Sequence, residues 1–527
     1  MGKRPIIFVF GLLFLAGLSP GISAQDKATI NSIEILQYPP FDSAATLRLI
    51  NRVANALHVQ TKEFVIRREL LFNKGDSVNQ ALFDETERNL RRLGFLNSVE
   101  IRQIRLNDST VDVSVVTHDS WSLSGGLWYS TNGGIIKYGA NVAERNLAGL
   151  GQTLGIAYDH QSNRKNPNGY SANYGVPRLF NSTWESSLGY ANSEDLRAYA
   201  VQIDKPFYTE SSKWSAGIHA DGGTFKAQEY VNGYASVTHF LDFQSQDIWG
   251  VYSTNDGDAK TRLGAAVVRQ HYAQDSSFNR RDQHILLANL SAGWVTRTYR
   301  KETYLNSLGA VEDVSLGFAS SVVAGKDLVT PGLYYFLLQE LFSGATGQFF
   351  AGSSASVQGY RAQSGFEDVT LSFGAILAQK THASGVVAAN INGTFGSNWN
   401  PGAQLYLDSP NSLRGLPAFA LSGDRRFVVN IEDRFDNGVS LWHFETGSVF
   451  FLDCGSIWSQ GQGNLAPRFY KSVGYGIRIM NEGLLGPGVL RLDFAYNIDR
   501  HQFEFIFTTG QLFSVFDGVD TASPLSY

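Results

Sequence analysis

The feature that most constrains this chain is a two-residue alternation of apolar and polar side chains, which runs from Trp121 almost to the C-terminus. Segments of about ten alternating residues are separated by short Gly, Asn, Asp and Ser turns, such as 131–134 and 255–258. A period of two is the repeat of a β-strand, because successive side chains point to opposite faces. Only 334–341 also resembles a helix. We therefore predict a mainly β C-terminal region.

The last segments separate most clearly into two faces. One set of faces carries Phe427, Val429 and Ile431, then Leu490, Leu492, Phe494 and Tyr496, then Phe503, Phe505, Phe507 and Phe513. The opposite faces carry Asn430, Glu432 and Arg434, then Arg491 and Asp493, then Gln502 and Glu504. A soluble β-sandwich also alternates, but charged residues are only 17% of this chain, against ~25% in ordinary soluble domains. The pattern favours a transmembrane antiparallel β-barrel at 119–513, with an apolar belt outside and a polar lumen.

The N-terminus has the pattern of a secretory signal peptide. A basic start (Met1–Arg4) precedes an apolar run (Ile6–Leu18), and Ala24 offers a small residue for cleavage before Gln25. The alternative is a membrane anchor, for which the run is short and the cleavage site would have no purpose. We predict that 1–24 is removed and that the mature chain has no apolar stretch long enough for a spanning helix.

Residues 25–118 differ from the rest because they carry more charge and the clearest helix patterns. Apolar spacing predicts helices over 46–59, from Thr61 to about Phe72, and over 79–93, where Gly94 follows as a stop signal. Strands are expected at 30–36, 95–104 and 110–117. The sequence therefore predicts a compact α+β module in front of the barrel.

Two segments of this module resemble a POTRA domain. They are Thr61–Leu70 (TKEFVIRREL) and Leu90–Val99 (LRRLGFLNSV), with Gly75 between them, and they are similar to the POTRA domain next to the barrel in BamA-type outer-membrane assembly factors. The extra helix at 46–59 departs from that family, and another small α+β periplasmic domain is the alternative. The resemblance implies a sheet edge to which an unfolded strand can add by backbone hydrogen bonding.

The barrel region also resembles the BamA superfamily. The segment Ser412–Leu416 is similar to the tip of the inward-folded lid loop, with Leu413, Arg414, Gly415 and Leu416 as its motif. Phe451, Asp453 and Gly455 match the Phe-x-Asp-x-Gly strand motif, and Glu144–Gly151 is similar to the second strand and its turn. The window count allows sixteen to nineteen strands, whereas the resemblance implies about sixteen, five of them after the lid loop.

The resemblance implies a structural role for these residues. An arginine carried into the lumen requires acidic partners, because an unpaired buried charge is costly. By alternation, Glu432 and Asp453 face inward and are the expected partners of Arg414. Gly415 would let the loop turn tightly beside the barrel wall.

A seam between the first and last strands is the second expected site. Its residues would be Ser124, Gly125 and Gly126 in the first strand, and Phe503, Phe505, Phe507, Gly510 and Phe513 in the last. Residues 514–527 extend beyond the expected final aromatic residue. Either they form a periplasmic tail or the last strand ends elsewhere.

Composition and motifs exclude several classes of function. A net charge of −5 leaves no basic excess for nucleic acid, and one cysteine excludes disulfide scaffolds and cysteine-based metal sites. The ten histidines lack metal-ligand spacing, and no phosphate loop or dinucleotide fingerprint is present. We expect no enzyme, cofactor or metal. A lipid-modifying Ser/His pair on the outer wall is the alternative, because spacing across strands is invisible in sequence.

The resemblance implies a non-enzymatic protein of the outer membrane, with the POTRA-like domain in the periplasm. It would assist insertion of outer-membrane proteins, capturing client strands at the POTRA edge and the seam. The alternative is a two-partner-type secretion pore for one dedicated exported protein, and an ordinary porin would lack the POTRA-like module and lid loop. Expected partners are the lipid bilayer and unfolded outer-membrane or secreted clients, and the resemblance also allows for accessory lipoproteins.

Overall fold

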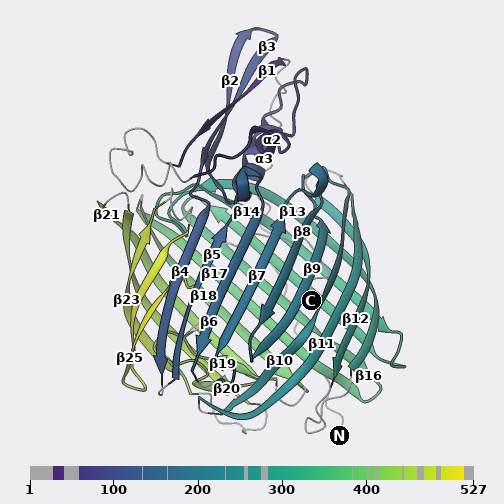
Figure 1. Ribbon diagram of the computed structural model, residues 1–527, viewed down its shortest axis with the longest axis vertical. Helices are drawn as coiled ribbons and strands as arrows, with labels where there is room; N and C mark the ends of the chain where they lie inside the picture. Colours follow the sequence, from purple (N-terminus) through teal and green to yellow (C-terminus); the bar gives the residue numbers. More distant parts are fainter. Residues whose placement is uncertain are drawn as a thin grey trace.

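The computed structural model describes residues 28–40, 58–132, 135–162, 164–231, 233–254, 259–273, 283–382, 384–399, 403–409, 413–441, 444–459, 468–481 and 488–515. The predicted signal peptide, nearly all of the predicted 46–59 helix and residues beyond 515 lie outside these ranges. The chain forms a small α+β module stacked on a β-barrel (Figure 1). We call the barrel end next to the module the proximal rim and the other end the distal rim.

The N-terminal module contains a three-stranded sheet with two helices. Its elements are β1 (Thr29–Tyr38), α2 (Glu63–Arg67), α3 (Gln80–Arg92), β2 (Leu96–Asn107) and β3 (Thr110–Asp119). The central strand β3 is parallel to β1 and antiparallel to β2, so β2 is a terminal strand of the sheet. No helix among the described residues is both long and apolar enough to cross a bilayer.

The two helices differ in how closely they follow the sequence prediction. The Asn79 side chain accepts hydrogen bonds from the Ala81 and Leu82 amides, so α3 begins as predicted. The helix expected from Thr61 to about Phe72 is shorter in the structure. Lys62 is its N-cap, and α2 begins at Glu63 and ends at Arg67. The Thr61 hydroxyl instead accepts a hydrogen bond from Asn146 of the barrel.

The barrel is closed and antiparallel, and its described part contains twenty strands. Six short strands come first: β4 (Leu123–Asn132), β5 (Ile135–Glu144), β6 (Thr153–Gln161), β7 (Asn168–Val176), β8 (Glu185–Asn192) and β9 (Leu196–Lys205). Nine longer ones follow: β10 (Trp214–Val231), β11 (Tyr234–Ser253), β12 (Ala259–Ala273), β13 (Gln283–Glu302), β14 (Glu312–Asp327), β15 (Tyr334–Thr346), β16 (Phe349–Ala362), β17 (Gly365–His382) and β18 (Gly385–Ser397). After the lid loop come β21 (Arg425–Leu441), β22 (Phe444–Trp458), β23 (Tyr470–Met480), β24 (Leu490–Asn497) and β25 (Gln502–Thr509).

The fold class is as predicted, but the expected count of sixteen strands is wrong. Five strands follow the lid loop, as the resemblance implies, so the additional strands lie before it. Residues 334–341, which resembled a helix, form most of β15 and pair along their length with β14 and β16.

Alternation places the two faces of the last strands as predicted. Phe503, Phe505 and Phe507 are 79%, 58% and 60% exposed on the outer wall, where lipid would cover them. Asp493 of the neighbouring strand is fully buried on the lumen side. The lumen side also contains a buried apolar cluster, formed by Trp249, Val251, Val268, Ile285, Leu287 and Tyr335 on alternate positions of β11–β15.

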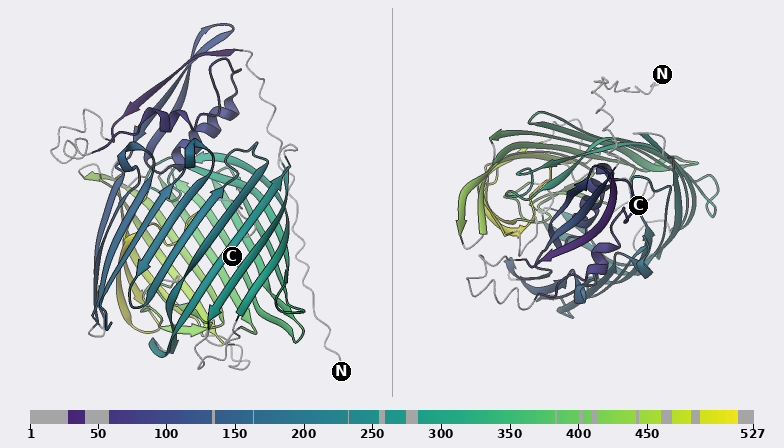
Figure 2. Two further views of the ribbon diagram at one scale, coloured as in Figure 1. Left: turned by 45° about the vertical axis from the view of Figure 1, so that its right-hand side comes forward. Right: turned by 90° about the horizontal axis from the view of Figure 1, so that it is seen from above.

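The module docks on turns of the proximal rim and lies over part of the barrel opening (Figure 2). The buried Glu69 carboxylate lies 2.7 Å from the Arg178 guanidinium and accepts a 2.7 Å hydrogen bond from the Tyr208 hydroxyl. Burial, together with the nearby Glu69, raises the pKa of Tyr208, so its phenol stays protonated as a donor. Arg91 of α3 makes two 2.9 Å contacts with the Asp313 carboxylate. The interface is therefore held by buried, charge-assisted hydrogen bonds.

Glu69→Gln should loosen this docking. Arg178 would keep a buried charge without its carboxylate, and breaking a buried pair in this way costs about 3–5 kcal/mol. Hydrogen exchange of residues 58–72 and of the Arg178 and Tyr208 turns should become faster, while β3 stays protected. Glu63→Gln is the matched control, because its pair with Arg67 is exposed on both sides and should change exchange little. Unchanged exchange in Glu69→Gln would contradict the proposed importance of this contact.

Candidate functional site

The candidate site lies in the lumen and centres on the loop between β18 and β21, which we call the lid loop (398–424). The loop contains a short hairpin, β19 (Leu405–Leu407) and β20 (Leu421–Gly423), at the distal end of the barrel (Figure 1). Leu407, Leu413 and Leu416 are fully buried and pack with Val428 of β21. Two of the predicted motif residues, Leu413 and Leu416, therefore anchor the loop to the wall by apolar contact.

Arg414 is fully buried and is surrounded by carboxylates. Its Nε and Nη2 donate to the two Asp453 oxygens, each at 2.8 Å, and its Nη1 donates to Glu432 at 2.7 Å. The structure thus brings together Arg414 and the two partners proposed from sequence. A third carboxylate, Asp493, lies 3.2 Å from Nη1.

The geometry explains how a charge can be buried here. Taking an ion out of water costs several kcal/mol, which only well-placed opposite charges and hydrogen bonds offset. The paired contact with Asp453 matches the planar guanidinium, and the Phe451 ring centroid lies 3.5 Å from the guanidinium carbon. Because the carboxylates come from β21, β22 and β24, one loop side chain ties three strands together.

Gly415 places this arginine. Its φ is +85°, and an added Cβ would lie 3.0 Å from the Asn497 backbone nitrogen, so a side chain would meet both strain and contact. The Gly415 amide donates a 2.8 Å hydrogen bond to Glu504 of β25. The loop is therefore bonded directly to the last strand.

The strand motif on β22 lines the same site. Phe451 and Asp453 face inward as described above, and Gly455 lies two residues further on the same face. A Cβ on Gly455 would come within 2.8 Å of a Leu407 methyl group and 3.3 Å of a Leu413 methyl group. The glycine therefore leaves space for the apolar anchor of the lid loop.

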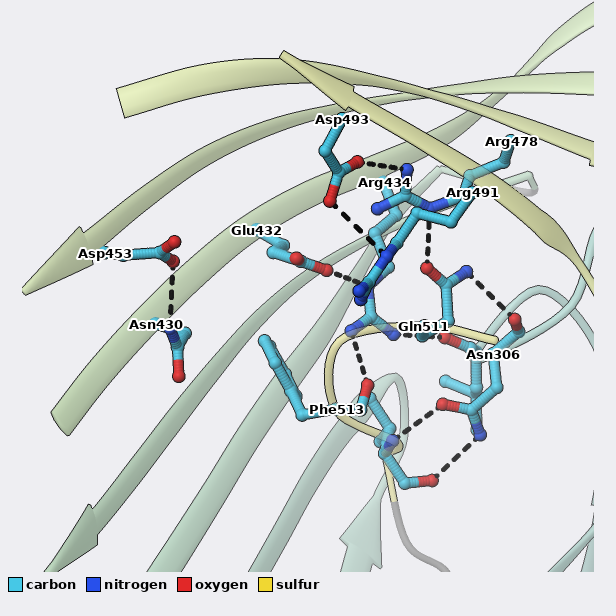
Figure 3. A network of polar contacts seen from close by, with 12 residues as sticks. Asn306, Asn430, Glu432, Arg434, Asp453, Arg478, Arg491, Asp493, Gln511 and Phe513 are labelled. Atoms are coloured by element: carbon cyan, nitrogen blue, oxygen red, sulfur yellow. Dashed lines mark hydrogen bonds and ion pairs between the residues drawn. The ribbon is translucent and has the colours of Figure 1, made fainter. Parts of the chain in front are cut away.

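Three arginines that we did not single out as site residues belong to the same network (Figure 3). Arg434 of β21 donates to Glu432 at 2.8 Å, and Arg478 of β23 donates to Asp493 at 2.6 Å. Arg491 of β24 lies 3.5 Å from Asp493. Alternation had already placed Arg434, Arg491 and Asp493 opposite apolar faces, so the signal was present. The contacts of these residues with the lid-loop network could not be predicted, because they depend on which strands become neighbours.

The seam residues divide into two groups. Ser124, Gly125 and Gly126 lie in β4, while Phe503, Phe505 and Phe507 lie in β25, and these two strands are neighbours in the closed barrel. Gly510 and Phe513 do not belong to the strand, which corrects the prediction. β25 ends at Thr509, and Gly510 takes a left-handed φ of +80° that turns the chain away.

Arg414→Gln should strongly destabilise the barrel. Buried carboxylates would lose their shared cation, which costs about 3–5 kcal/mol in the free energy of unfolding. Urea unfolding followed by tryptophan fluorescence measures this, and Asp453→Asn in the same chain should recover part of the loss. Arg102→Gln is the control, because its pair with Glu100 is exposed on both sides and should contribute little to stability. Equal urea midpoints for Arg414→Gln and the unchanged chain would contradict this account.

Within the described residues, no group of three or more His, Cys, Asp or Glu side chains could hold a metal ion. The contacts described at this site are ion pairs, hydrogen bonds and apolar packing.

Residues 54–118 match the POTRA family, described as a surface antigen variable number repeat. Similar solved structures include BamA from Haemophilus ducreyi lacking POTRA domains 1–3, at 13% identity, covering 93% of this chain and 85% of that one with a TM-score of 0.37. CdiB from Escherichia coli is 10% identical, with 92% and 76% coverage and a TM-score of 0.46. CdiB from Acinetobacter baumannii is 13% identical, with 92% and 74% coverage and a TM-score of 0.44. Residues 54–118 are therefore a POTRA-type domain, and it stands directly before a closed antiparallel β-barrel.

Proposed function

We propose that this protein is a non-enzymatic assembly factor that helps unfolded outer-membrane proteins insert into the bilayer. A client strand would first pair with the edge strand β2 of the POTRA domain and would then enter the seam between β4 and β25. The observation that carries the proposal is the edge strand. It ends a three-stranded sheet and exposes apolar side chains on the periplasmic side of the barrel.

The far half of β2 is suited to strand capture. Ile104 and Leu106 are 54% and 51% exposed. Val99 and Ile101 pack in the module core, so alternation puts Ile104 on the sheet face turned away from the helices, and exposed Leu106 follows at the register shift between Arg105 and Asn107. An added strand would gain backbone hydrogen bonds along β2 and apolar contacts at alternate positions.

The seam joins short strands. β24 and β25 have eight residues each and β4 has ten, whereas β10 and β11 have 18 and 20. A short strand forms fewer ladder hydrogen bonds, so less pairing must be broken to admit a client strand. No nucleotide is required in this scheme, because a barrel that folds into lipid satisfies its backbone hydrogen bonds and only the barrier must be lowered.

The second candidate is a secretion pore for one exported protein. It is favoured by a lumen cavity of about 590 Å³, which is lined largely by small polar side chains of β14–β18 and by Arg426. A hydrated wall of this kind could accompany an unfolded chain through the barrel. The two functions therefore differ in route, through the seam or along the lumen.

Substitution of the edge residues tests the proposed function. The purified chain in liposomes should accelerate the folding of an unfolded barrel client over empty liposomes. Ile104→Asp with Leu106→Asp should lower that acceleration about tenfold, because the double variant removes the apolar contacts of a captured strand. A tenfold change corresponds to about 1.4 kcal/mol.

Gln103→Asp is the matched control for Ile104→Asp alone, since each adds one negative charge, but Gln103 lies on the other face of β2, where it contacts Gln80 of α3. Equal losses in both variants would indicate a general charge effect and not strand capture. No acceleration by the unchanged chain, together with ion conductance and passage of a soluble protein, would overturn the assembly proposal in favour of the secretion pore.

A further inference from the structure

The chain does not leave the barrel after its last strand. Gly510 turns it inward, and Gln511–Val515 run into the proximal end of the lumen. We call Gly510–Val515 the strap. The sequence predicted Gly510 and Phe513 in the last strand and left residues 514–527 as either a periplasmic tail or a sign that the strand ends elsewhere. The described residues of the strap lie inside the barrel, and Val515 is fully buried.

The barrel binds the main chain of the strap at two places. Arg434 Nη2 donates a 2.7 Å hydrogen bond to the Phe513 carbonyl. Asn306, in the connection between β13 and β14, accepts from the Val515 amide at 2.6 Å and donates to the Val515 carbonyl at 3.2 Å. One asparagine side chain thus satisfies both polar backbone groups of Val515, as a neighbouring strand would.

Side chains hold the strap as well. The Gln511 side chain accepts from Arg478 Nε at 2.8 Å and donates to the Asn306 carbonyl at 3.0 Å. The Arg434 guanidinium carbon lies 4.6 Å from the Phe513 ring centroid. Val515 packs in a buried apolar cluster with Leu305, Val314, Phe350, Ala378, Val386 and Ala388. The strap therefore fills a site with charged, amide and apolar parts.

The arginines that hold the strap share carboxylates with the lid loop. Glu432 binds Arg414 through one oxygen at 2.7 Å and Arg434 through the other at 2.8 Å. Asp493 likewise binds Arg414 at 3.2 Å and Arg478 at 2.6 Å. Each of these two carboxylates therefore pairs both with Arg414 of the lid loop and with a barrel-wall arginine that holds the strap; Figure 3 shows Arg434 and Arg478 beside them. Displacing either cation changes the charge balance that the other experiences.

The strap also borders the lumen cavity. Leu512 and Ser514 contribute to the lining of the 590 Å³ space along β14–β18. Because the strap continues directly from β25, it cannot leave the lumen without moving the proximal end of that strand. Movement of the seam strand and widening of the cavity are thereby linked by chain connectivity.

We propose that the strap is an internal latch that holds β25 and the lumen closed, and that it is coupled to the lid loop through Glu432 and Asp493. Release of the lid loop weakens the hold of Arg434 and Arg478 on the strap, and extraction of the strap frees the seam strand. The occupant of the site is this chain's own C-terminal segment. The latch acts in the same way whether the protein inserts or secretes its clients.

Thiol labelling of Val515→Cys tests the latch. The native Cys454 is first replaced by serine, so that the introduced thiol is the only one. In the folded full-length protein, a docked strap should slow maleimide labelling at least tenfold relative to the exposed position Asn107→Cys. Arg434→Gln and Asn306→Ala, which remove direct contacts, should each raise the labelling rate of Val515→Cys about tenfold.

The coupling requires that Arg414→Gln also raises the labelling rate of Val515→Cys, although Arg414 is on the lid loop. Arg426→Gln is the matched control. It lies eight residues before Arg434 on β21, roughly 26 Å away along the strand, and donates to the Tyr406 carbonyl of the lid loop. It should leave the rate unchanged.

Heat-modifiability on gels first selects the variants that fold, and Asn306→Ala serves if an arginine variant does not. Fast labelling of Val515→Cys in the otherwise unchanged chain would overturn docking of the strap. Equal labelling rates for Arg414→Gln and Arg426→Gln would overturn the coupling. Bilayer conductance that rises in Asn306→Ala would support closure of the lumen by the strap, and unchanged conductance in a variant with a freed strap would overturn it.

Discussion

The buried ion pairs of Arg414 are the interaction on which the distal and central parts of this structure depend. A guanidinium at this depth persists only because Asp453, Glu432 and Asp493 converge on it from three strands. The surrounding features serve that placement: Gly415 permits the turn, Gly455 leaves space for the leucine anchor, and Phe451 covers the charged plane. The lid loop is thus fixed by electrostatics at its tip and by apolar packing on either side of it.

The same carboxylates extend the network toward the proximal rim. Glu432 and Asp493 bind Arg414 of the lid loop. Glu432 also binds Arg434 and Asp493 also binds Arg478, and these two arginines hold the strap. The strap also contacts Asn306, and the strand ends on either side of that connection carry Lys301 and Asp313, which pair with Glu87 and Arg91 of the POTRA helix α3. Lid loop, strap and POTRA domain are therefore connected by direct contacts. β25 takes part twice, through Glu504 to Gly415 and through its own continuation into the strap.

The greater strand number changes what the lumen must contain. Barrel diameter grows with the number of strands, so twenty strands enclose more space than the expected sixteen. The lid loop and strap occupy the side formed by β18–β25, while the inner wall of β11–β15 buries an apolar cluster and the POTRA domain docks on the turns of the proximal rim. These elements fill the lumen from different directions.

Alternation along single strands was enough to determine the fold class, the outward position of Phe503, Phe505 and Phe507, and the inward position of Glu432, because side-chain direction in a strand is a local property with a period of two. The motif residues Arg414, Gly415 and Asp453 were proposed from their resemblance to short sequence motifs of the BamA superfamily. Only the tertiary structure decided the strand count, the third carboxylate Asp493, the arginines that share it and the path of the chain after Thr509. The strand count and the shared carboxylate depend on which strands become neighbours around a closed barrel. The path after Thr509 depends on the left-handed conformation of Gly510 and on the barrel wall that the turned chain contacts.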